Sequence, residues 1–463
     1  MQGPILIVRL LEMRRPLQAY KLAQRVTIVA QDLELRDVLI HILFLQSLAA
    51  YELRCYRKSG ELLDGLRTVA ETANISLPKE TSDRIRTAKK AVDTRLHELQ
   101  HGDYDWLSLF RKSMTQESEQ RYLLEAADFI GPVKLDWASG KGRGLFATRD
   151  VRAGELLLVE KAIGVGFEVE NVVDHRKSYD FLFPRTVVPG VSTASNRLFA
   201  QVVSGVLDNP DLYHQLTQLS GGSKSDSLPP LTLPPSENVW LESESPAFTQ
   251  LGLEEIRTMT ELNAYNLPLV GKDLSDGPSL DVNETGGLFY ACSFMNHSCI
   301  PNAFRIAFGD IMVIRANIDL KKGAEITQSY MARAPYHIRA SRLRDSWGID
   351  CTCAMCQADR MEGYKVLSRR RKLIRYTGWV VGPIASYFGP FALFLSRLLP
   401  SRWAHIPASP LVFALKRLVR MMEETFTHSE DRQYKDLHLS AAYSTLGILT
   451  AFQNHLTAIE VRP

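Results

Sequence analysis

Four consecutive polar side chains of different chemical types mark the centre of this sequence. Asn296, His297, Ser298 and Cys299 lie in the stretch 289–302, between an apolar run and Pro301. A turn uses one or two such groups to satisfy its backbone. An amide, an imidazole, a hydroxyl and a thiol in succession offer more donors, acceptors and metal ligands than a structural turn needs. An isolated Asn-His pair is more often a satisfied turn, so its meaning depends on other segments.

Three cysteines lie close together farther along the chain. Cys351 and Cys353 are separated by one residue, and Cys353 and Cys356 by two. Structural zinc ions take four ligands in a tetrahedral arrangement, so three thiolates at this spacing leave one ligand to be found. The alternative interpretation is a group of ordinary buried thiols.

Two further segments contain candidate functional residues. Gly142 and Gly144 flank Arg143 in a glycine-rich segment, and this spacing alone predicts a hairpin turn, because glycine adopts positive φ without strain. Tyr330 ends the segment 325–330, and the alternative interpretation is a plain core aromatic residue.

In their order along the chain, the four segments resemble the SET-domain protein lysine methyltransferases. The nearest relatives look like the SET-and-MYND branch and its TPR-and-SET cousins. The seven-residue match at 296–302 is the most specific part of the resemblance. The similarity covers about 130–168 and 262–360, less than a third of the chain. Only Cys55 and Cys292 remain outside the close group and Cys299, too few for the two-zinc MYND finger of that branch.

The resemblance implies a site for S-adenosylmethionine (SAM). The glycine segment would let the backbone approach the cofactor, with two fixed cations near its carboxylate. The Asn-His pair would bind the cofactor from a knot-like crossing of the chain. The positions that match cofactor-contacting residues of the family are Lys141, Gly142, Arg143, Gly144, Asn263, Ser293, Asn296, His297 and Tyr330.

The resemblance also assigns a catalytic role to Tyr330. A lysine must lose a proton before it can attack a methyl group, which costs about 4 to 5 kcal/mol at neutral pH. A narrow apolar channel, here expected to contain Tyr265, Trp347 and Ile349, lowers that cost by desolvating the ammonium group. The Tyr330 hydroxyl would orient the amine and stabilise the polarised methyl group.

One position departs from the family pattern. Relatives often carry an aromatic residue two positions before the first post-SET cysteine, where this chain has Ile349. Isoleucine fills apolar space but offers no ring face to a cation. Either Trp347 substitutes for the ring, or activity and the degree of methylation differ.

The resemblance names Cys299 as the fourth zinc ligand, beside Cys351, Cys353 and Cys356. Four thiolates complete one structural site. Such a site stabilises its fold by roughly 10 kcal/mol or more in apparent terms, enough to order a short loop-rich post-SET segment.

Hydropathy patterns and the resemblance together predict an α+β protein: a β-rich, knotted SET domain with small sheets and a zinc-bound post-SET segment, flanked by helical regions. Residues 38–50 are apolar nearly all round and predict a buried helix. No clean 34-residue repeat is visible, so a TPR-like array and an unrelated helical cap stay open. The expected regions are a helical N-terminal region at 1–128, a SET domain at 129–334 split by a helical and disordered insertion at 169–261, a post-SET segment at 335–360 and a helical C-terminal region at 361–463.

Composition restricts the class of protein and its surroundings. A chain of 463 residues suggests two to four domains. The net charge of +3 demands no polyanionic partner, so direct nucleic-acid binding is not expected. Six cysteines in such a chain fit a reducing compartment, nucleus or cytoplasm. The N-terminal segment lacks the order of a secretory signal.

Residues 376–395 carry no charge and are long enough to span a membrane. Three glycines and two prolines weaken any helix there, so a buried hairpin or a segment foreign to the family is preferred. The basic residues just before this run are best explained as a solvated helix face.

The sequence therefore predicts SAM-dependent methyl transfer to a lysine of a protein substrate, histone or non-histone. The helical flanks would form walls of a substrate groove or surfaces for protein partners. The rival interpretation is a non-catalytic SET-domain scaffold. Ile349 favours that rival, whereas the glycine segment, the Asn-His pair and Tyr330 oppose it.

Overall fold

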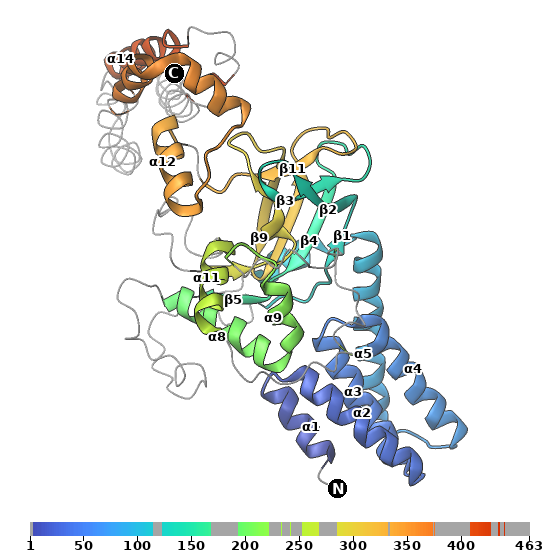
Figure 1. Ribbon diagram of the computed structural model, residues 1–463. Coiled ribbons are helices and arrows are strands. Elements are labelled where there is room, and N and C mark those ends of the chain that lie inside the picture. The colour runs from blue at the N-terminus through green and yellow to red at the C-terminus, as the bar shows by residue number, and fades with distance from the viewer. Residues whose placement is uncertain are drawn as a thin grey trace, which may run out of the picture. The chain divides into compact units, whose positions relative to one another are not determined.

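The chain divides into two compact units (Figure 1). The first comprises Met1–Asn296 and Asn302–Thr327, and the second comprises His297–Pro301 and Gln328–Pro463. The computed structural model describes residues 3–113, 123–167, 193–221, 233, 241, 252–267, 285–331, 334–373, 375, 408–426, 434–435 and 439.

The first unit begins with helices that follow one another in antiparallel pairs. They are α1 (Gly3–Glu12), α2 (Pro16–Asp32), α3 (Arg36–Glu52), α4 (Tyr56–Thr72), α5 (Lys79–His101) and α6 (Trp106–Ser113). Helix α3 contains the apolar residues 38–50, and Ile42, Ala49 and Ala50 on it are fully buried. The predicted buried helix is confirmed, although Val38 at its start remains 37 % exposed.

The turns between these helices repeat every 20 residues. Helices α2, α3 and α4 are each 17 residues long. Residues 14, 34, 54 and 74 all adopt positive φ, and the residue after each donates its backbone N–H to the carbonyl five residues back. This is the 6→1 hydrogen bond of the Schellman motif, which ends a helix with a left-handed residue. A helical pair therefore spans 40 residues, against the 34 of a tetratricopeptide repeat.

Two four-stranded sheets follow the helices. The first has the order β1-β4-β10-β9, formed by β1 (Phe129–Ile130), β4 (Leu156–Lys161), β10 (Ile311–Ala316) and β9 (Ala303–Phe308). The second has the order β2-β3-β11-β8, formed by β2 (Val133–Ala138), β3 (Gly142–Ala147), β11 (Glu325–Gln328) and β8 (Asn296–His297). Strands β4 and β10 are central and almost wholly buried, as their continuous apolar runs predict.

A three-stranded sheet packs against helices of the insertion. Its order is β5-β7-β6, formed by β5 (Gly164–Phe167), β7 (Thr285–Leu288) and β6 (Ala264–Asn266). The helices are α8 (Thr193–Asp208), α9 (Pro210–Leu216) and α11 (Leu253–Asn263). Helix α8 lies so close to β5 that a Cβ atom at Gly166 would meet the carbonyl oxygen of Ala194 at 1.8 Å. Only glycine fits there, so this contact fixes the insertion on the sheet.

The second unit contains α12 (Tyr336–Trp347), helical residues 354–373 and α14 (Ala408–Glu423). Leu373, Val419, Met422 and Phe426 form a small core at α14. The apolar segment 376–395 and residues 440–463 of the predicted helical C-terminal region lie outside the described residues. Among the residues that are described, no helix is long and apolar enough to cross a membrane.

Candidate functional site

The glycine segment forms the β2–β3 hairpin of the first unit. Gly142 has φ of +81°, a backbone conformation that side chains rarely adopt. Gly144 is needed for a different reason: a Cβ atom there would lie 2.9 Å from Asn296 Nδ2 and 3.3 Å from Glu325 Oε1. The absence of a side chain at Gly144 lets these two polar groups reach the strand.

Asn296, Lys141 and Glu325 form one hydrogen-bonded group at this hairpin. Asn296 Nδ2 donates to Glu325 Oε1 at 2.9 Å and to the carbonyl oxygen of Arg143 at 3.0 Å. Lys141 Nζ forms an ion pair with Glu325 Oε2 at 2.8 Å. The carboxylate of Glu325 thus holds two of the predicted cofactor-contacting residues. Sequence analysis did not single out Glu325, which was noted only as the first residue of the segment 325–330.

Arg143 turns from the hairpin toward the insertion. Its guanidinium donates to Gln218 Oε1 at 3.0 Å and also to the Gln218 carbonyl oxygen, and it lies 5.3 Å from the ring centre of Phe294. Burial lowers the pKa of Arg143 from its ordinary value. Its charge is therefore engaged by a carbonyl, an amide and a ring face rather than by a carboxylate.

Three other predicted residues of the first unit bond to backbone carbonyl groups. Asn263 Nδ2 donates to Met259 O at 2.7 Å and to Ser220 O at 2.8 Å. Tyr265 donates its hydroxyl to Cys292 O at 2.6 Å, and Ser293 donates to Phe289 O. The structure therefore brings Tyr265 and Ser293 to the same short turn, η3 (Cys292–Phe294), that leads into Asn296.

Glu160 is a buried acid that sequence reasoning missed. It lies on β4, and its two carboxylate oxygens accept hydrogen bonds from the backbone N–H groups of Ala291 and Cys292, both at 2.8 Å. Burial, and then the charge of Asp128, raise the pKa of Glu160 to about 7. An acid at the end of an apolar strand resembles the residue at which the strand reaches solvent, and so the pattern hid it.

Asn302, the last residue of the 296–302 segment, forms hydrogen bonds with the backbone of β11. Its Nδ2 donates to Glu325 O at 2.8 Å, and its Oδ1 accepts from Thr327 N at 2.8 Å. An amide is suited to this because it offers a donor and an acceptor side by side. The residue therefore positions the strand that carries Glu325.

His297 and Tyr330 contact each other in the second unit. The backbone N–H of Tyr330 donates to His297 Nδ1 at 3.1 Å, and the two ring centres are 5.3 Å apart. On its other side the Tyr330 ring lies 5.4 Å from the ring centre of Trp347. Ile349 belongs to the same apolar cluster as Tyr330. Three predicted residues, Tyr330, Trp347 and Ile349, are thus brought together.

The four predicted metal ligands are also brought together in the second unit. The sulfur atoms of Cys299, Cys351, Cys353 and Cys356 all lie within 4.8 Å of one another. The sulfur atoms of Cys299 and Cys356 are 3.5 Å apart. In a tetrahedral site with zinc–sulfur bonds of about 2.3 Å, the sulfur atoms are roughly 3.8 Å apart. The arrangement therefore fits one zinc ion with four thiolate ligands.

Shared protons explain the acidity of these thiols. Hydrogen bonding, first of all with Cys299, lowers the pKa of Cys351 and brings that of Cys353 to about 6. The same contacts raise the pKa of Cys299. A bound zinc ion would require all four as thiolates.

Comparison with known proteins identifies the sheets and the loops that contain these residues. The family described as SET domain matches residues 142–331. The chain contains a SET domain. That range includes the glycine hairpin, the Asn-His pair and Tyr330, and the predicted resemblance to the SET family is confirmed.

The similarity to curated proteins is partial. A protein named Methyltransferase from Gibberella zeae is 25 % identical over 378 residues, which cover 78 % of this chain and 47 % of that protein. The human N-lysine methyltransferase SMYD2 is 31 % identical over 105 residues, 20 % of this chain and 24 % of SMYD2. This chain thus spans about half the length of the first relative and a quarter of the second.

Among solved structures, a crystal structure of the SET domain of LSMT bound to lysine and AdoHcy covers 76 % of this chain at 10 % identity, with a TM-score of 0.24. The assignment of the SET domain rests on the sequence family and not on this superposition.

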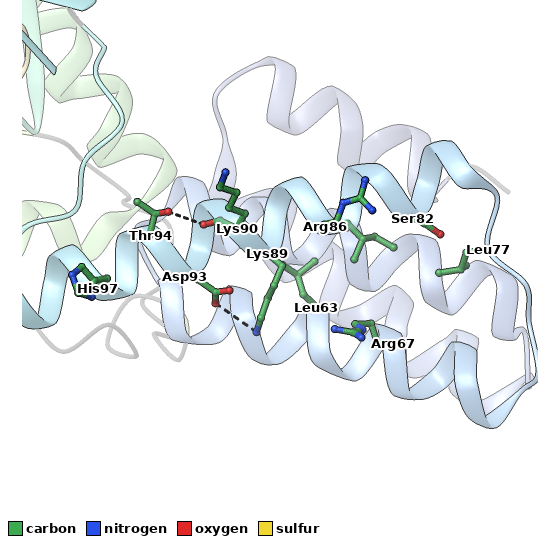
Figure 2. A pocket seen from close by; sticks show the side chains of 11 residues that line it. Leu63, Arg67, Leu77, Ser82, Arg86, Lys89, Lys90, Asp93, Thr94 and His97 are labelled. Carbon is green, nitrogen blue, oxygen red and sulfur yellow. Dashed lines mark hydrogen bonds and ion pairs between the residues drawn. The ribbon is translucent and has the colours of Figure 1, made fainter. Parts of the chain in front are cut away.

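A groove of about 790 Å³ lies outside the SET domain, between α4 and α5 (Figure 2). Leu63 and Ile85 contribute apolar surface, and Lys89 pairs with Asp64 at 2.8 Å and with Asp93 at 3.9 Å. None of the predicted site residues lines it. The groove belongs to the helical region and not to the candidate site.

Proposed function

We propose that this SET domain transfers a methyl group from SAM to a lysine side chain of a protein. The observation that carries the proposal is the position of Tyr330, held by His297 through its backbone and flanked by the ring of Trp347. A tyrosine fixed in this way keeps its hydroxyl in one place during the reaction. Fixed dipoles stabilise developing charge without having to reorganise.

The residues assigned to the cofactor are Lys141, Gly142, Arg143, Gly144, Asn263, Ser293, Asn296, His297 and Tyr330. SAM, when bound, supplies a methyl group on a positively charged sulfur. Glu325 supports this assignment because it holds Asn296 and Lys141 beside the glycine hairpin. Positively charged groups there suit the carboxylate end of the cofactor.

The residues assigned to the lysine channel are Tyr265, Tyr330, Trp347 and Ile349. An apolar channel removes water from the lysine ammonium and favours loss of its proton to solvent. The neutral amine then forms a carbon–nitrogen bond as the carbon–sulfur bond breaks, and the electron pair of that bond stays on sulfur. The extra proton on the new amine leaves afterwards. Tyr330 is assigned to orient the amine for this displacement.

The four cysteines are assigned to one structural zinc ion of a post-SET segment. Their sulfur spacing supports the assignment, and thiolates are the common ligands of structural zinc. The ion would hold Cys299 against residues 351–356, and so order the turn that follows His297. We assign it no step in methyl transfer.

A non-catalytic scaffold is the second candidate. Ile349 favours it because it replaces the ring that relatives often place beside the channel. The engagement of Lys141 by Glu325 and of Arg143 by Gln218 is also compatible with a site that needs no cofactor. The two candidates differ in whether SAM binds and whether a methyl group is transferred.

The decisive test is transfer from labelled SAM to a broad mixture of proteins, with SAM binding followed by calorimetry. We expect Tyr330→Phe to lower transfer by roughly 10²- to 10³-fold, the usual loss for one donor in a transition state, while SAM still binds. Tyr364→Phe is a matched control, because the Tyr364 side chain is 85 % exposed on helical residues 354–373. Zinc-loaded, folded protein that binds no SAM would refute the enzyme and leave the scaffold.

A further inference from the structure

Three buried charged side chains form a row that starts at the four cysteines. Arg339 and Asp359 are in contact, with 2.5 Å between a guanidinium nitrogen and Asp359 Oδ2, and their side chains are 3 % and 0 % exposed. The other oxygen of Asp359 lies 3.6 Å from Arg370, whose side chain is 4 % exposed. Charges this deeply buried are destabilising unless each is paired. In this row Asp359 lies between the two arginines, so each charge has a neighbour of opposite sign.

The first member of the row touches the sulfur cluster. The same nitrogen of Arg339 that pairs with Asp359 lies 3.8 Å from Cys356 Sγ as a donor. The other terminal nitrogen donates to Ala334 O at 2.6 Å, which fixes the plane of the guanidinium. An arginine side chain stays protonated in proteins, so Arg339 is a cation beside the sulfurs.

A cation at this position matters most when a metal is bound. Four thiolates around one zinc ion carry two net negative charges, and placing that charge among buried groups is unfavourable. An arginine N–H aimed at a ligand sulfur offsets the charge and orients the ligand. Groups that bond to metal ligands in this way commonly contribute 10- to 100-fold in metal affinity.

The last member of the row touches the end of α14. Arg370 Nε donates to Thr425 Oγ1, and a terminal nitrogen of Arg370 donates to Thr425 O, both at 3.0 Å. The guanidinium also lies 3.6 Å from the ring centre of Phe426. Phe426 packs in the small core of α14. One chain of contacts therefore joins Cys356, through Arg339, Asp359 and Arg370, to the C-terminal region.

We propose that Arg339 is the charge and hydrogen-bonding partner of a metal ion held by the four cysteines, and that the Arg339–Asp359–Arg370 row couples occupancy of that site to the packing of α14. The inference rests on the proposed zinc site and not on methyl transfer. A second arginine provides an internal comparison. Arg360 contacts the cysteine segment through the backbone carbonyl of Cys351, at 2.7 Å, and not through a sulfur atom. It also bonds to Tyr336 and Asp350, each at 3.0 Å, and its side chain is 36 % exposed.

Metal affinity tests the first half of the proposal in the full chain. Zinc affinity would be measured by competition with a chromogenic chelator for wild type, Arg339→Gln and Arg360→Gln. We expect a 10- to 100-fold loss for Arg339→Gln and a change below threefold for Arg360→Gln. Cobalt substitution adds a spectroscopic readout, since the thiolate-to-cobalt band should shift in Arg339→Gln alone. Equal affinities and bands in wild type and Arg339→Gln would overturn the role of Arg339.

Hydrogen exchange of residues 408–426 tests the coupling. Zinc removal from wild type should speed exchange there by at least tenfold, while zinc removal from Arg370→Gln should change it far less, because the far contact is already lost. Far-ultraviolet circular dichroism serves as the check that each variant has folded. Exchange in 408–426 that ignores zinc would refute the coupling, even where Arg339 still tunes affinity. A chain that binds neither zinc nor cobalt would overturn both halves and leave the methyl-transfer proposal to its own test.

Discussion

The two units hold their candidate functional residues by different means. In the first unit, Asn296, Lys141 and Tyr265 are each fixed by hydrogen bonds or ion pairs to strands and turns. In the second unit, the sulfur atoms of residues 299, 351, 353 and 356 bring together the turn after β8 and the start of the helical residues 354–373. The first arrangement is complete with protein atoms alone, whereas four adjacent thiols are the usual ligand set of a structural metal ion.

This difference separates two sources of order. Hydrogen bonds in the first unit each contribute about 1 kcal/mol, and many act in parallel. The metal in the second unit would contribute roughly ten times as much through one centre. The first unit should therefore tolerate single losses, and the second should fail when its centre is lost.

Removal of the metal is expected to produce the largest effect. Cys351→Ser should abolish zinc binding and disorder the segment around the cysteines, because zinc supplies roughly 10 kcal/mol in apparent terms. Segment-resolved hydrogen exchange and zinc content would be measured together. Cys292→Ala is the control. Because Cys292 is fully buried in the first unit, this variant should lose some stability but still bind zinc. Unchanged exchange around 351–356 in zinc-free protein would remove the contrast between the units.

The next effect concerns the pH dependence of the first unit. Because the pKa of Glu160 is about 7 in the fold and near 4.5 when unfolded, the unfolded chain releases the proton first as pH rises. The contribution of Glu160 to stability is full below about pH 4.5 and falls by about 3 kcal/mol as pH rises through 7. Glu160→Gln should remove this fall.

Urea unfolding of wild type and Glu160→Gln at pH 5, 6, 7 and 8 would measure the slope. The difference between the two proteins isolates Glu160 from the other groups that titrate over this range. Parallel pH profiles would show that the carboxylate keeps its ordinary pKa, and that burial does not control this turn.

A smaller effect is expected from the amide that forms hydrogen bonds with the backbone of β11. Asn302→Ala removes the acceptor for Thr327 N and the donor for Glu325 O, which should cost about 2 kcal/mol in the free energy of unfolding. Zinc content should not change. Asn317→Ala provides the matched control, because Asn317 is exposed. A loss for Asn302→Ala no greater than for Asn317→Ala would show that these hydrogen bonds are dispensable.

Sequence alone could predict the segments that carry chemistry because their residue types are unusual in succession. It could also predict buried strands from the apolar runs 156–159 and 311–314, which lie within β4 and β10. The spacing of the cysteines could not identify the fourth metal ligand. Cys299 lies 52 positions before Cys351, and only the family resemblance named it. Glu160 was hidden because its partners are backbone N–H groups, which leave no mark in the sequence.

The helical period was hidden for a related reason. Glycine is the usual residue at a left-handed helix end and would have marked each turn. Here those positions are Arg14, Glu34, Arg54 and Asn74, the last a common substitute and the others not. Hydropathy predicts each helix. The 20-residue spacing of the helix ends depends on a backbone conformation that these residue types do not predict.

The regular turns also govern how this region can change in length over evolution. Removing one 20-residue helix would reverse the direction of every helix before it, whereas removing a 40-residue pair would keep them in phase. Arg54 sets a limit to such change, because its side chain donates to Lys161 O at 3.0 Å and to Ala162 O at 2.7 Å, at the end of β4. Leu17 on α2 sets a second limit, because its backbone N–H donates to Asp208 Oδ2 of α8 at 3.0 Å. A change in the number of helices would therefore have to keep both contacts with the rest of the first unit.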